Sequence, residues 1–161
     1  MILAFSHPGM VVPDLEKAIA FYRDMFGFRV IGEEGWEDSP ETDRAIGLQG
    51  SASKGCIMAG HNCFLELFEY KAPQQIAPLP DQFLAHEIGI RHLAFYVDDV
   101  KKEFDRLISL GGSALGEADE GAAAVYARDP FGNIIELALI PGGEEEPTRL
   151  PGVDKLSSFQ G

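Results

Sequence analysis

The chain has 161 residues, of which 45% are hydrophobic and 24% are charged, and its formal net charge is −13. This length and composition are typical of a soluble globular protein of about one domain. The acidic charge argues against nucleic-acid or membrane binding, because those surfaces need clustered Lys and Arg. We therefore expect a small-molecule partner, with no nucleic acid and no membrane as partner.

The opening segment, MILAFSHPGMVV, lacks the basic region and the apolar run of a signal peptide, and no stretch of the chain approaches 18 apolar residues. These features predict a cytoplasmic protein. Its two cysteines, Cys56 and Cys63, are then expected to be reduced and packed as small hydrophobic side chains.

The first half of the chain predicts a strand, a helix and a set of further strands. Apolar residues at 2–5 and 10–12 indicate a strand interrupted at His7. Beyond Asp14, apolar side chains recur at three- and four-residue spacing up to Gly27, which predicts an amphipathic helix. Shorter apolar runs then predict three strands, at 28–31, 55–59 and 63–69.

Three segments look irregular. Residues 33–53 hold Gly, Ser, Pro and acidic residues around Trp36, and we interpret them as a surface loop that could cover a site. Residues 71–87, with three prolines, are interpreted as a linker. Residues 142–161 form an acidic, Pro- and Gly-rich tail.

The second half repeats the first. A strand at 88–97 leads to Asp98 or Asp99 and to a helix that ends at residues 111–112, and strands follow around a DPFGN hairpin turn, at 123–127 and 133–140. Three positions recur at an offset of 85 residues: His7 and His92, Asp14 and Asp99, and Gly27 and Gly112.

Each half ends in an apolar strand with one embedded carboxylate, Glu66 in CFLELFEY and Glu136 in NIIELALI. Residues two apart in a strand share a face, so both Glu and both repeated His are expected on the sheet face opposite the helices. Taken singly, such a His or Glu is more often structural. The repeat favours one divalent ion, Zn, Ni, Co, Mn or Fe, held by four ligands, because buried carboxylates need compensation. The predicted ligands are His7, Glu66, His92 and Glu136.

The segments HPGMVVPDLEKAIAFYRDMFGF, LELFEY, RHLAFYVDDV and DPFGNIIEL resemble the vicinal oxygen chelate superfamily over about residues 1–140. This superfamily includes glyoxalase I, methylmalonyl-CoA epimerase, fosfomycin-resistance and bleomycin-binding proteins and extradiol dioxygenases. The resemblance implies an α+β fold in which two tandem βαβββ modules form a curled mixed sheet around a central metal cleft, with the helices outside. It also implies a homodimer.

In these terms, residues 1–141 are one domain, made of module one (1–70), the linker (71–87) and module two (88–141). The four predicted ligands match the positions from which the glyoxalase-like branch draws its metal ligands.

The resemblance implies a metal-dependent lyase, isomerase or epimerase in which the metal is a Lewis acid and a carboxylate moves a proton through an enediolate or enolate. Glu66 and Glu136 are the candidates for proton transfer. The residues expected around the substrate are aromatic: Phe64, Phe68, Tyr96 and Trp36.

Two alternatives stay open, an iron-dependent extradiol dioxygenase and a non-enzymatic antibiotic-binding resistance protein. Tyr126, ten residues before Glu136, has the spacing of the catalytic Tyr of extradiol dioxygenases, whereas a fourth ligand at Glu66 counts against that chemistry. Val11 stands where glutathione-dependent glyoxalases often carry Arg, and Cys56 where the epimerases carry a second catalytic Glu. The first departure counts against glutathione as a substrate, and the second counts against two-base epimerisation.

Overall fold

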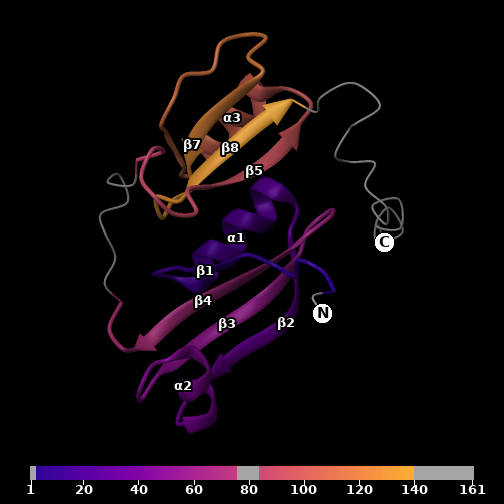
Figure 1. Cartoon of the computed structure of the whole chain (residues 1–161). Coiled ribbons are helices and arrows are strands. Elements are labelled where there is room, and N and C mark those ends of the chain that lie inside the picture. Colours follow the sequence, from indigo (N-terminus) through magenta and orange to yellow (C-terminus); the bar gives the residue numbers. More distant parts are fainter. Residues whose placement is uncertain (1–2, 76–83, 140–161) are drawn as a thin grey trace. The chain divides into compact units, whose positions relative to one another are not determined.

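The computed structural model describes residues 3–75 and 84–139, and the chain divides into two compact units, residues 1–77 and 78–161. Each unit contains one four-stranded mixed sheet and one longer helix (Figure 1). The predicted α+β fold of two similar modules is therefore confirmed. The predicted tail, 142–161, lies outside the described residues.

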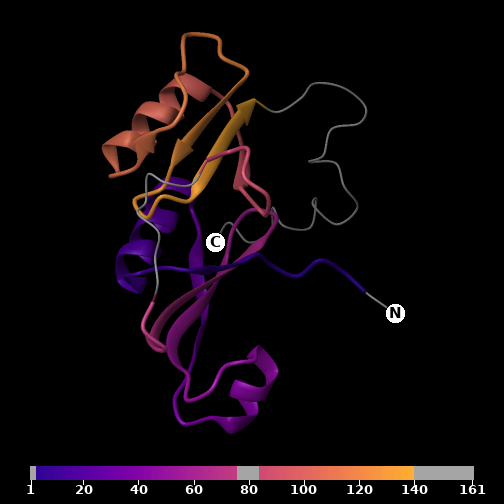
Figure 2. The same ribbon diagram turned by 60° about the vertical axis from the view of Figure 1, so that its left-hand side comes forward.

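Unit 1 has its strands in the order β1-β4-β3-β2, with β1 parallel to β4 and the other neighbours antiparallel. Helix α1 lies against one face of this sheet (Figure 2). The elements are β1 (Gly9–Val11), α1 (Leu15–Phe26), β2 (Arg29–Trp36), α2 (Pro40–Ile46), β3 (Ala52–Ala59) and β4 (Phe64–Ala72).

Helix α1 begins and ends where the sequence predicts. The side chain of Asp14 caps it by accepting a hydrogen bond from the backbone N–H of Lys17, and Gly27 ends it in the left-handed conformation, with φ 71°. The core of unit 1 joins the buried side of α1 to one face of β3 and β4. Its members include Leu15, Ala18, Phe21, Tyr22, Met25, Cys56, Met58, Leu65 and Leu67.

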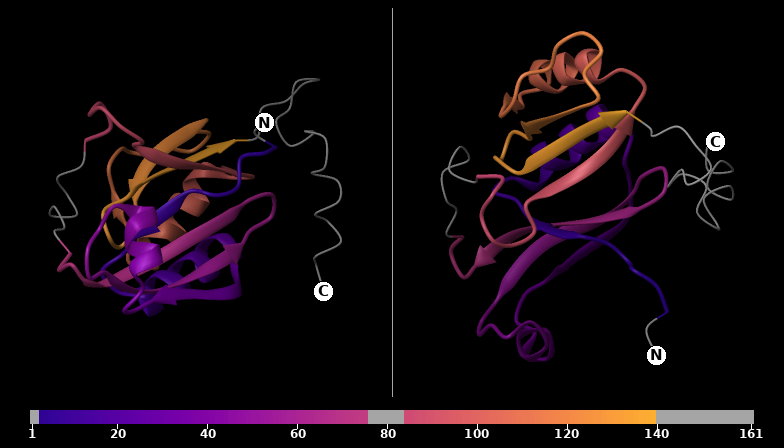
Figure 3. Two further views of the ribbon diagram at one scale, coloured as in Figure 1. Left: turned by 60° about the horizontal axis from the view of Figure 1, so that its bottom comes forward. Right: turned by 45° about the horizontal axis from the view of Figure 1, so that its top comes forward.

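Unit 2 repeats this topology with the order β5-β8-β7-β6 and a parallel β5–β8 pair (Figure 3). Its helix α3 is capped by Asp99 as α1 is by Asp14. The predicted hairpin turn is confirmed, with the Asp129 carboxylate accepting hydrogen bonds from the backbone N–H groups of Phe131 and Asn133. The elements are β5 (His92–Val97), α3 (Val100–Ser109), β6 (Ser113–Ala114), β7 (Ala124–Arg128) and β8 (Ile134–Leu139).

Several predicted boundaries are wrong. The described residues before His7 are not a strand, because β1 begins only at Gly9, and β5 likewise begins at His92 rather than at residue 88. Strand β4 runs from Phe64 to Ala72, past residue 69, where the sequence predicts the strand to end. Cys63 is exposed in the turn between β3 and β4, whereas Cys56 is buried as expected.

The segment 33–53 is not a loop. Its first residues complete β2, its last begin β3, and α2 lies between them, with Ser39 as the N-cap and Pro40 in the first turn. This short helix buries none of its residues, so it lacks the apolar stripe that would have revealed it. No helix in the described parts of the chain is long and apolar enough to span a membrane.

Candidate metal centre

In unit 1, the first predicted ligand pair is formed. His7 directly precedes β1, Glu66 lies in β4, and the parallel register places Gly9 beside Glu66. The imidazole Nε2 of His7 lies 3.3 Å from Oε2 of Glu66, and both side chains are partly exposed, at 31% and 22%. A Cβ at position 9 would stand 3.4 Å from the same carboxylate oxygen, an ordinary van der Waals contact, so this position lies directly beside the pair.

Unit 2 contains the equivalent pair. His92 begins β5, Glu136 lies in β8, and Ala94 stands beside Glu136 in the parallel register, at the position that corresponds to Gly9. Nε2 of His92 lies 3.1 Å from Oε2 of Glu136, with side-chain exposures of 36% and 23%. The two halves of the chain thus build the same local arrangement from matching sequence positions.

Both imidazoles also have a hydroxyl group at their other nitrogen. Oγ of Ser6 lies 2.9 Å from Nδ1 of His7, and the hydroxyl of Tyr126 lies 3.4 Å from Nδ1 of His92. The Tyr126 and His92 rings are in contact, with centroids 5.0 Å apart. A hydroxyl that accepts a hydrogen bond from Nδ1–H leaves Nε2 with a free lone pair, the form in which His binds a metal.

The donor atoms fit a divalent cation. Metal–N and metal–O bonds of about 2.0–2.2 Å place two adjacent ligand atoms about 3.0 Å apart in an octahedral site and about 3.4 Å apart in a tetrahedral one. The two Nε2–Oε2 distances, 3.3 and 3.1 Å, lie in this range. Imidazole and carboxylate donors suit zinc, nickel, cobalt, manganese and iron.

Each unit taken by itself supplies two of the four predicted ligands. Within the described residues, no group of three or more His, Cys, Asp and Glu side chains is arranged to hold a metal ion. The complete ligand set, His7, Glu66, His92 and Glu136, therefore stays a prediction.

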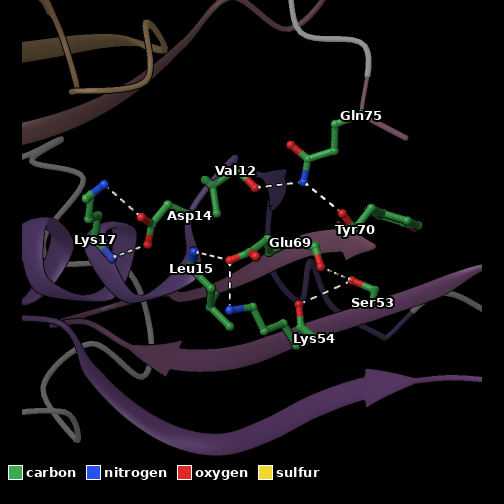
Figure 4. A network of polar contacts seen from close by, with 9 residues as sticks. All are labelled: Val12, Asp14, Leu15, Lys17, Ser53, Lys54, Glu69, Tyr70 and Gln75. Carbon is green, nitrogen blue, oxygen red and sulfur yellow. Dashed lines mark hydrogen bonds and ion pairs between the residues drawn. The ribbon is translucent and has the colours of Figure 1, made fainter. Parts of the chain in front are cut away.

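Glu69 shows how the two faces of the unit 1 sheet differ. Three residues after Glu66 in β4, it lies on the α1 side, where its Oε2 accepts a hydrogen bond from the backbone N–H of Leu15 at 2.7 Å and pairs with Nζ of Lys54 at 3.0 Å (Figure 4). The hydrogen bond from Lys54 to Glu69 raises the pKa of that lysine. This carboxylate holds the start of α1 on the sheet, whereas Glu66, on the other face, pairs with the imidazole of His7.

Aromatic side chains stand near the unit 1 pair. Phe64 and Phe68 lie two residues either side of Glu66 in β4, so strand alternation places all three on one face. Trp36, at the end of β2, contacts Phe68 with ring centroids 5.3 Å apart. In unit 2, Tyr96 lies on β5 in the same row as His92 and is 46% exposed. Their role as a substrate pocket stays a prediction.

Sequence reasoning missed four polar or aromatic neighbours of these residues. They are Ser6, Tyr70, Asp43 and Ser51. The ring centroid of Tyr70 lies 5.6 Å from that of Trp36, and Ser51, bonded to Asp43, holds the Trp36 indole. Alternation along β4 could have indicated Tyr70. The other three depend on side-chain geometry that has no signal in the sequence.

Residues 4–137 match the Glyoxalase/Bleomycin resistance protein/Dioxygenase superfamily. The chain belongs to this superfamily. The resemblance seen in the sequence is thereby confirmed.

Several proteins with known names are similar to this chain in sequence or fold. A 2-epi-5-epi-valiolone epimerase from an Actinomyces species is 29% identical over 152 residues, which is 88% of this chain and 81% of the relative. A glyoxalase family protein from Bacillus cereus has a similar fold, with a TM-score of 0.75 and 24% identity over 86% of this chain and 95% of that one. The fosfomycin resistance protein FosX from Listeria monocytogenes, crystallised with Mn(II) and sulfate, has a TM-score of 0.53 and 24% identity over 91% and 98%.

Proposed function

We propose that this superfamily member is a metal-dependent enzyme that epimerises or isomerises a small carbonyl compound, or acts on one as a lyase. The observation that carries the proposal is the duplicated His–Glu pair, in which both units bring Nε2 and Oε2 to 3.1–3.3 Å and place a hydroxyl at Nδ1. The named epimerase among the relatives supports the reaction class. As the resemblance to the superfamily implies, we also propose a homodimer.

In this proposal the two pairs together hold one divalent ion. Bound there, the ion would supply a Lewis acid that stabilises negative charge on the carbonyl oxygen of the substrate. The imidazoles contribute neutral Nε2 donors, which the hydroxyls at Nδ1 orient. The carboxylates balance the charge of the ion. The ligands are His7, Glu66, His92 and Glu136.

The carboxylates of Glu66 and Glu136 are also the proposed bases. One removes the proton from the carbon next to the carbonyl, which leaves an enolate, and the same or the other carboxylate returns a proton to that carbon. A positioned base contributes roughly 10²–10⁴-fold to the rate. Inversion of a stereocentre requires that a base remove the proton from one face of the carbon and that an acid return a proton to the opposite face, and in this proposal one carboxylate acts as the base and the protonated form of the other as the acid.

Cys56 cannot be the second acid–base group. It stands where the superfamily's epimerases carry a Glu, but the structure buries it in the core on the α1 side of β3, on the face opposite Glu66. Burial raises the pKa of its thiol to about 11. This leaves Glu66 and Glu136 as the pair for any two-base reaction.

Metal content and proton exchange test the proposal. The full-length protein is loaded with Zn, Ni, Co or Mn, and exchange of deuterium from solvent into dihydroxyacetone and the ring ketone scyllo-inosose is followed by NMR against an enzyme-free control. We expect bound metal and catalysed exchange, with both lowered by Glu136→Gln and neither changed by Asp105→Asn on the exposed side of α3. Unchanged exchange in Glu136→Gln would remove that residue from the mechanism.

A dioxygenase is the second candidate, and one contact favours it. The Tyr126 hydroxyl lies beside His92, and Tyr126 pairs with Glu136 across β7 and β8, so a phenol stands next to both unit 2 ligands. Purified protein that contains iron and cleaves catechol in air would support this function. Glu66 counts against it because, as a fourth ligand, it would take a position needed by oxygen or catecholate.

A further inference from the structure

Three aromatic rings form a cluster on the unit 1 sheet. Trp36 comes from β2, and Phe68 and Tyr70 come from β4. Their ring centroids lie 5.3 Å (Trp36–Phe68), 5.6 Å (Trp36–Tyr70) and 6.4 Å (Phe68–Tyr70) apart, and all three pairs meet edge to face. Each side chain is only half-buried, so the cluster presents aromatic surface outward. We refer to these three residues as the aromatic cluster.

The cluster is on the same face as the Glu66 carboxylate. Phe68 follows Glu66 by two residues in β4, which corresponds to about 6.6 Å along the strand. Val11 stands beside Phe68 in the parallel register, and its side chain is 56% exposed. One six-membered ring with oxygen substituents can bridge the distance from the aromatic cluster to the His7–Glu66 pair.

The structure makes room for Phe68 at a glycine. Gly55 of β3 lies opposite Phe68, and a Cβ at that position would come 2.4 Å from Cδ1 of Phe68 and 2.5 Å from the backbone oxygen of Leu67. Any larger residue there would push the Phe68 ring away. The phenyl ring therefore lies over the bare backbone of β3, next to Trp36.

The Trp36 indole is held by a chain of polar groups. Its Nε1 donates a hydrogen bond to Oγ of Ser51 at 2.7 Å, and the hydroxyl of Ser51, which is only 1% exposed, donates in turn to Asp43 of α2. The same carboxylate accepts hydrogen bonds from the backbone N–H groups of Gly50 at 2.7 Å and Ser51 at 3.0 Å. These hydrogen bonds fix one orientation of the indole against its two neighbours.

The surroundings of the cluster favour an uncharged ligand. The two cross-strand rows that carry it contain one carboxylate, Glu34, and neither Lys nor Arg: the rows are Val11–Phe68–Gly55–Glu34 and Tyr70–Ser53–Trp36. A phosphate or carboxylate group would find no cationic partner in these rows and would be repelled by Glu34. Aromatic faces attract C–H bonds, whose hydrogens are weakly positive, as in the edge-to-face contacts among the rings themselves.

We propose that the aromatic cluster binds the carbon skeleton of an uncharged polyhydroxylated ring ketone, whose oxygens then reach the His7–Glu66 pair. Ser51 and Asp43 are positioning residues, which set the indole of Trp36 for this contact. The inference rests on the proposed function, since it names the substrate class for that site.

Trp36 is the one tryptophan in the chain, so its fluorescence reports directly on this cluster. The metal-loaded, full-length protein is titrated with scyllo-inosose, an uncharged polyhydroxylated ring ketone. Dihydroxyacetone serves as the acyclic comparison, 3-dehydroquinate as the ring ketone with a carboxylate, and catechol as the aromatic alternative. We expect a saturable change in emission with scyllo-inosose and at least tenfold weaker binding of the other three.

Variants distinguish loss of the ligand contact at the aromatic cluster from a general loss of stability. Phe68→Leu keeps an apolar side chain but removes the ring, and Ser51→Ala removes the acceptor for the indole, so each is expected to weaken binding of scyllo-inosose at least about fivefold, an aromatic contact being worth about one factor of ten. Ser53→Ala is the matched control, because the hydroxyl of this buried residue lies within hydrogen-bonding distance of the backbone oxygens of Lys54 and Glu69, whereas that of Ser51 holds the indole. It is expected to change neither the binding nor the emission maximum.

Each possible result either supports the proposal or overturns part of it. Weakened ring binding in Phe68→Leu and Ser51→Ala, with metal affinity unchanged, supports the proposal. Equal binding in Ser51→Ala and Ser53→Ala, with a lower melting temperature as the sole effect, would make the Ser51–Asp43 contact purely structural. Proton exchange without any response of Trp36 would overturn ligand binding at the aromatic cluster and leave the proposed function intact. A Trp36 response in a protein that binds no metal would support binding at the cluster and overturn the proposed function. Tighter binding of catechol would overturn the substrate class.

Discussion

The Glu66→Gln variant distinguishes two roles for Glu66, that of a metal ligand and that of a partner in a surface ion pair. The His7–Glu66 pair is partly exposed, and such pairs contribute about 0–1 kcal/mol to stability, so we expect the free energy of unfolding of the metal-free variant to change by no more than this. The free energy of metal binding should change far more than the free energy of unfolding. Structural zinc sites with four ligands are worth about 10–16 kcal/mol, so one ligand is worth about 2.5–4 kcal/mol. The variant should therefore lose about 10²–10³-fold in metal affinity.

Glu69→Gln is the matched control on the same strand. It removes a carboxylate that bonds Leu15 and Lys54 on the α1 side, so it should lower stability by roughly 1–3 kcal/mol and leave metal affinity unchanged. The measurements are titration with Co(II) or Zn(II) against a competing chelator, and thermal unfolding in EDTA. Equal metal affinity in the two variants would refute the assignment of Glu66 as a ligand.

Three further predictions follow from contacts around the same sheets. Tyr126→Phe and Ser6→Ala should each weaken metal binding by up to about 10–100-fold, measured by chelator competition, because they remove the hydroxyls at the two Nδ1 atoms. At pH 8 a thiol reagent should modify the exposed Cys63 in the folded protein, slowly because desolvation raises the pKa of this thiol too, and should reach Cys56 only after denaturation, because Cys56 is buried and its pKa is raised to about 11; two reactive thiols in the native protein would contradict this. Hydrogen bonds from Ser51 hold the pKa of the Asp43 carboxyl below its ordinary value of 3.8, so the stabilisation is present above that value and is lost as the pH falls through the lowered pKa. Trp36 emission should thus stay constant from pH 8 down to about 4 and shift only below it, and Asp43→Asn should remove this shift.

The sequence predicted the parts of the fold that depend on local signals. Helices α1 and α3 follow from an Asp cap and an apolar stripe, and these signals act within a few residues of each other. The two His–Glu pairs were predictable for a different reason. Chain duplication places each His and each Glu at matching points of two strands, and neighbouring parallel strands then bring them together.

The remaining features depend on contacts between distant residues or on weak local signals. The aromatic cluster joins Trp36 to Tyr70 through the register of β2, β3 and β4, which no local pattern encodes. Helix α2 has a cap at Ser39 and an αL glycine at Gly47, but with no buried residue it shows no periodicity. Apolar residues before β1 suggested a longer strand, yet Leu3 is 88% exposed and lies outside the sheet.

The assumption that one ion uses ligands from both units can be tested through Trp36, because this residue belongs to unit 1 while Glu136 belongs to unit 2. Metal at a thousand times its Kd should stabilise the folded protein by about 4 kcal/mol, which raises the melting temperature of a chain of this size by roughly 8–16 °C. If the ion is shared, unit 1 takes part in this gain, and Trp36 fluorescence should record it during thermal unfolding.

Glu136→Gln changes only the carboxylate of unit 2. With a shared ion, it should remove most of the metal-induced shift that Trp36 reports, although the His7–Glu66 pair is intact. If each pair bound metal separately, the Trp36 transition would keep its full shift in this variant, and only unit 2 would lose stabilisation. That second result would mean that the duplicated pairs are two independent two-ligand sites, and the four-ligand centre, with the chemistry proposed for it, would be wrong.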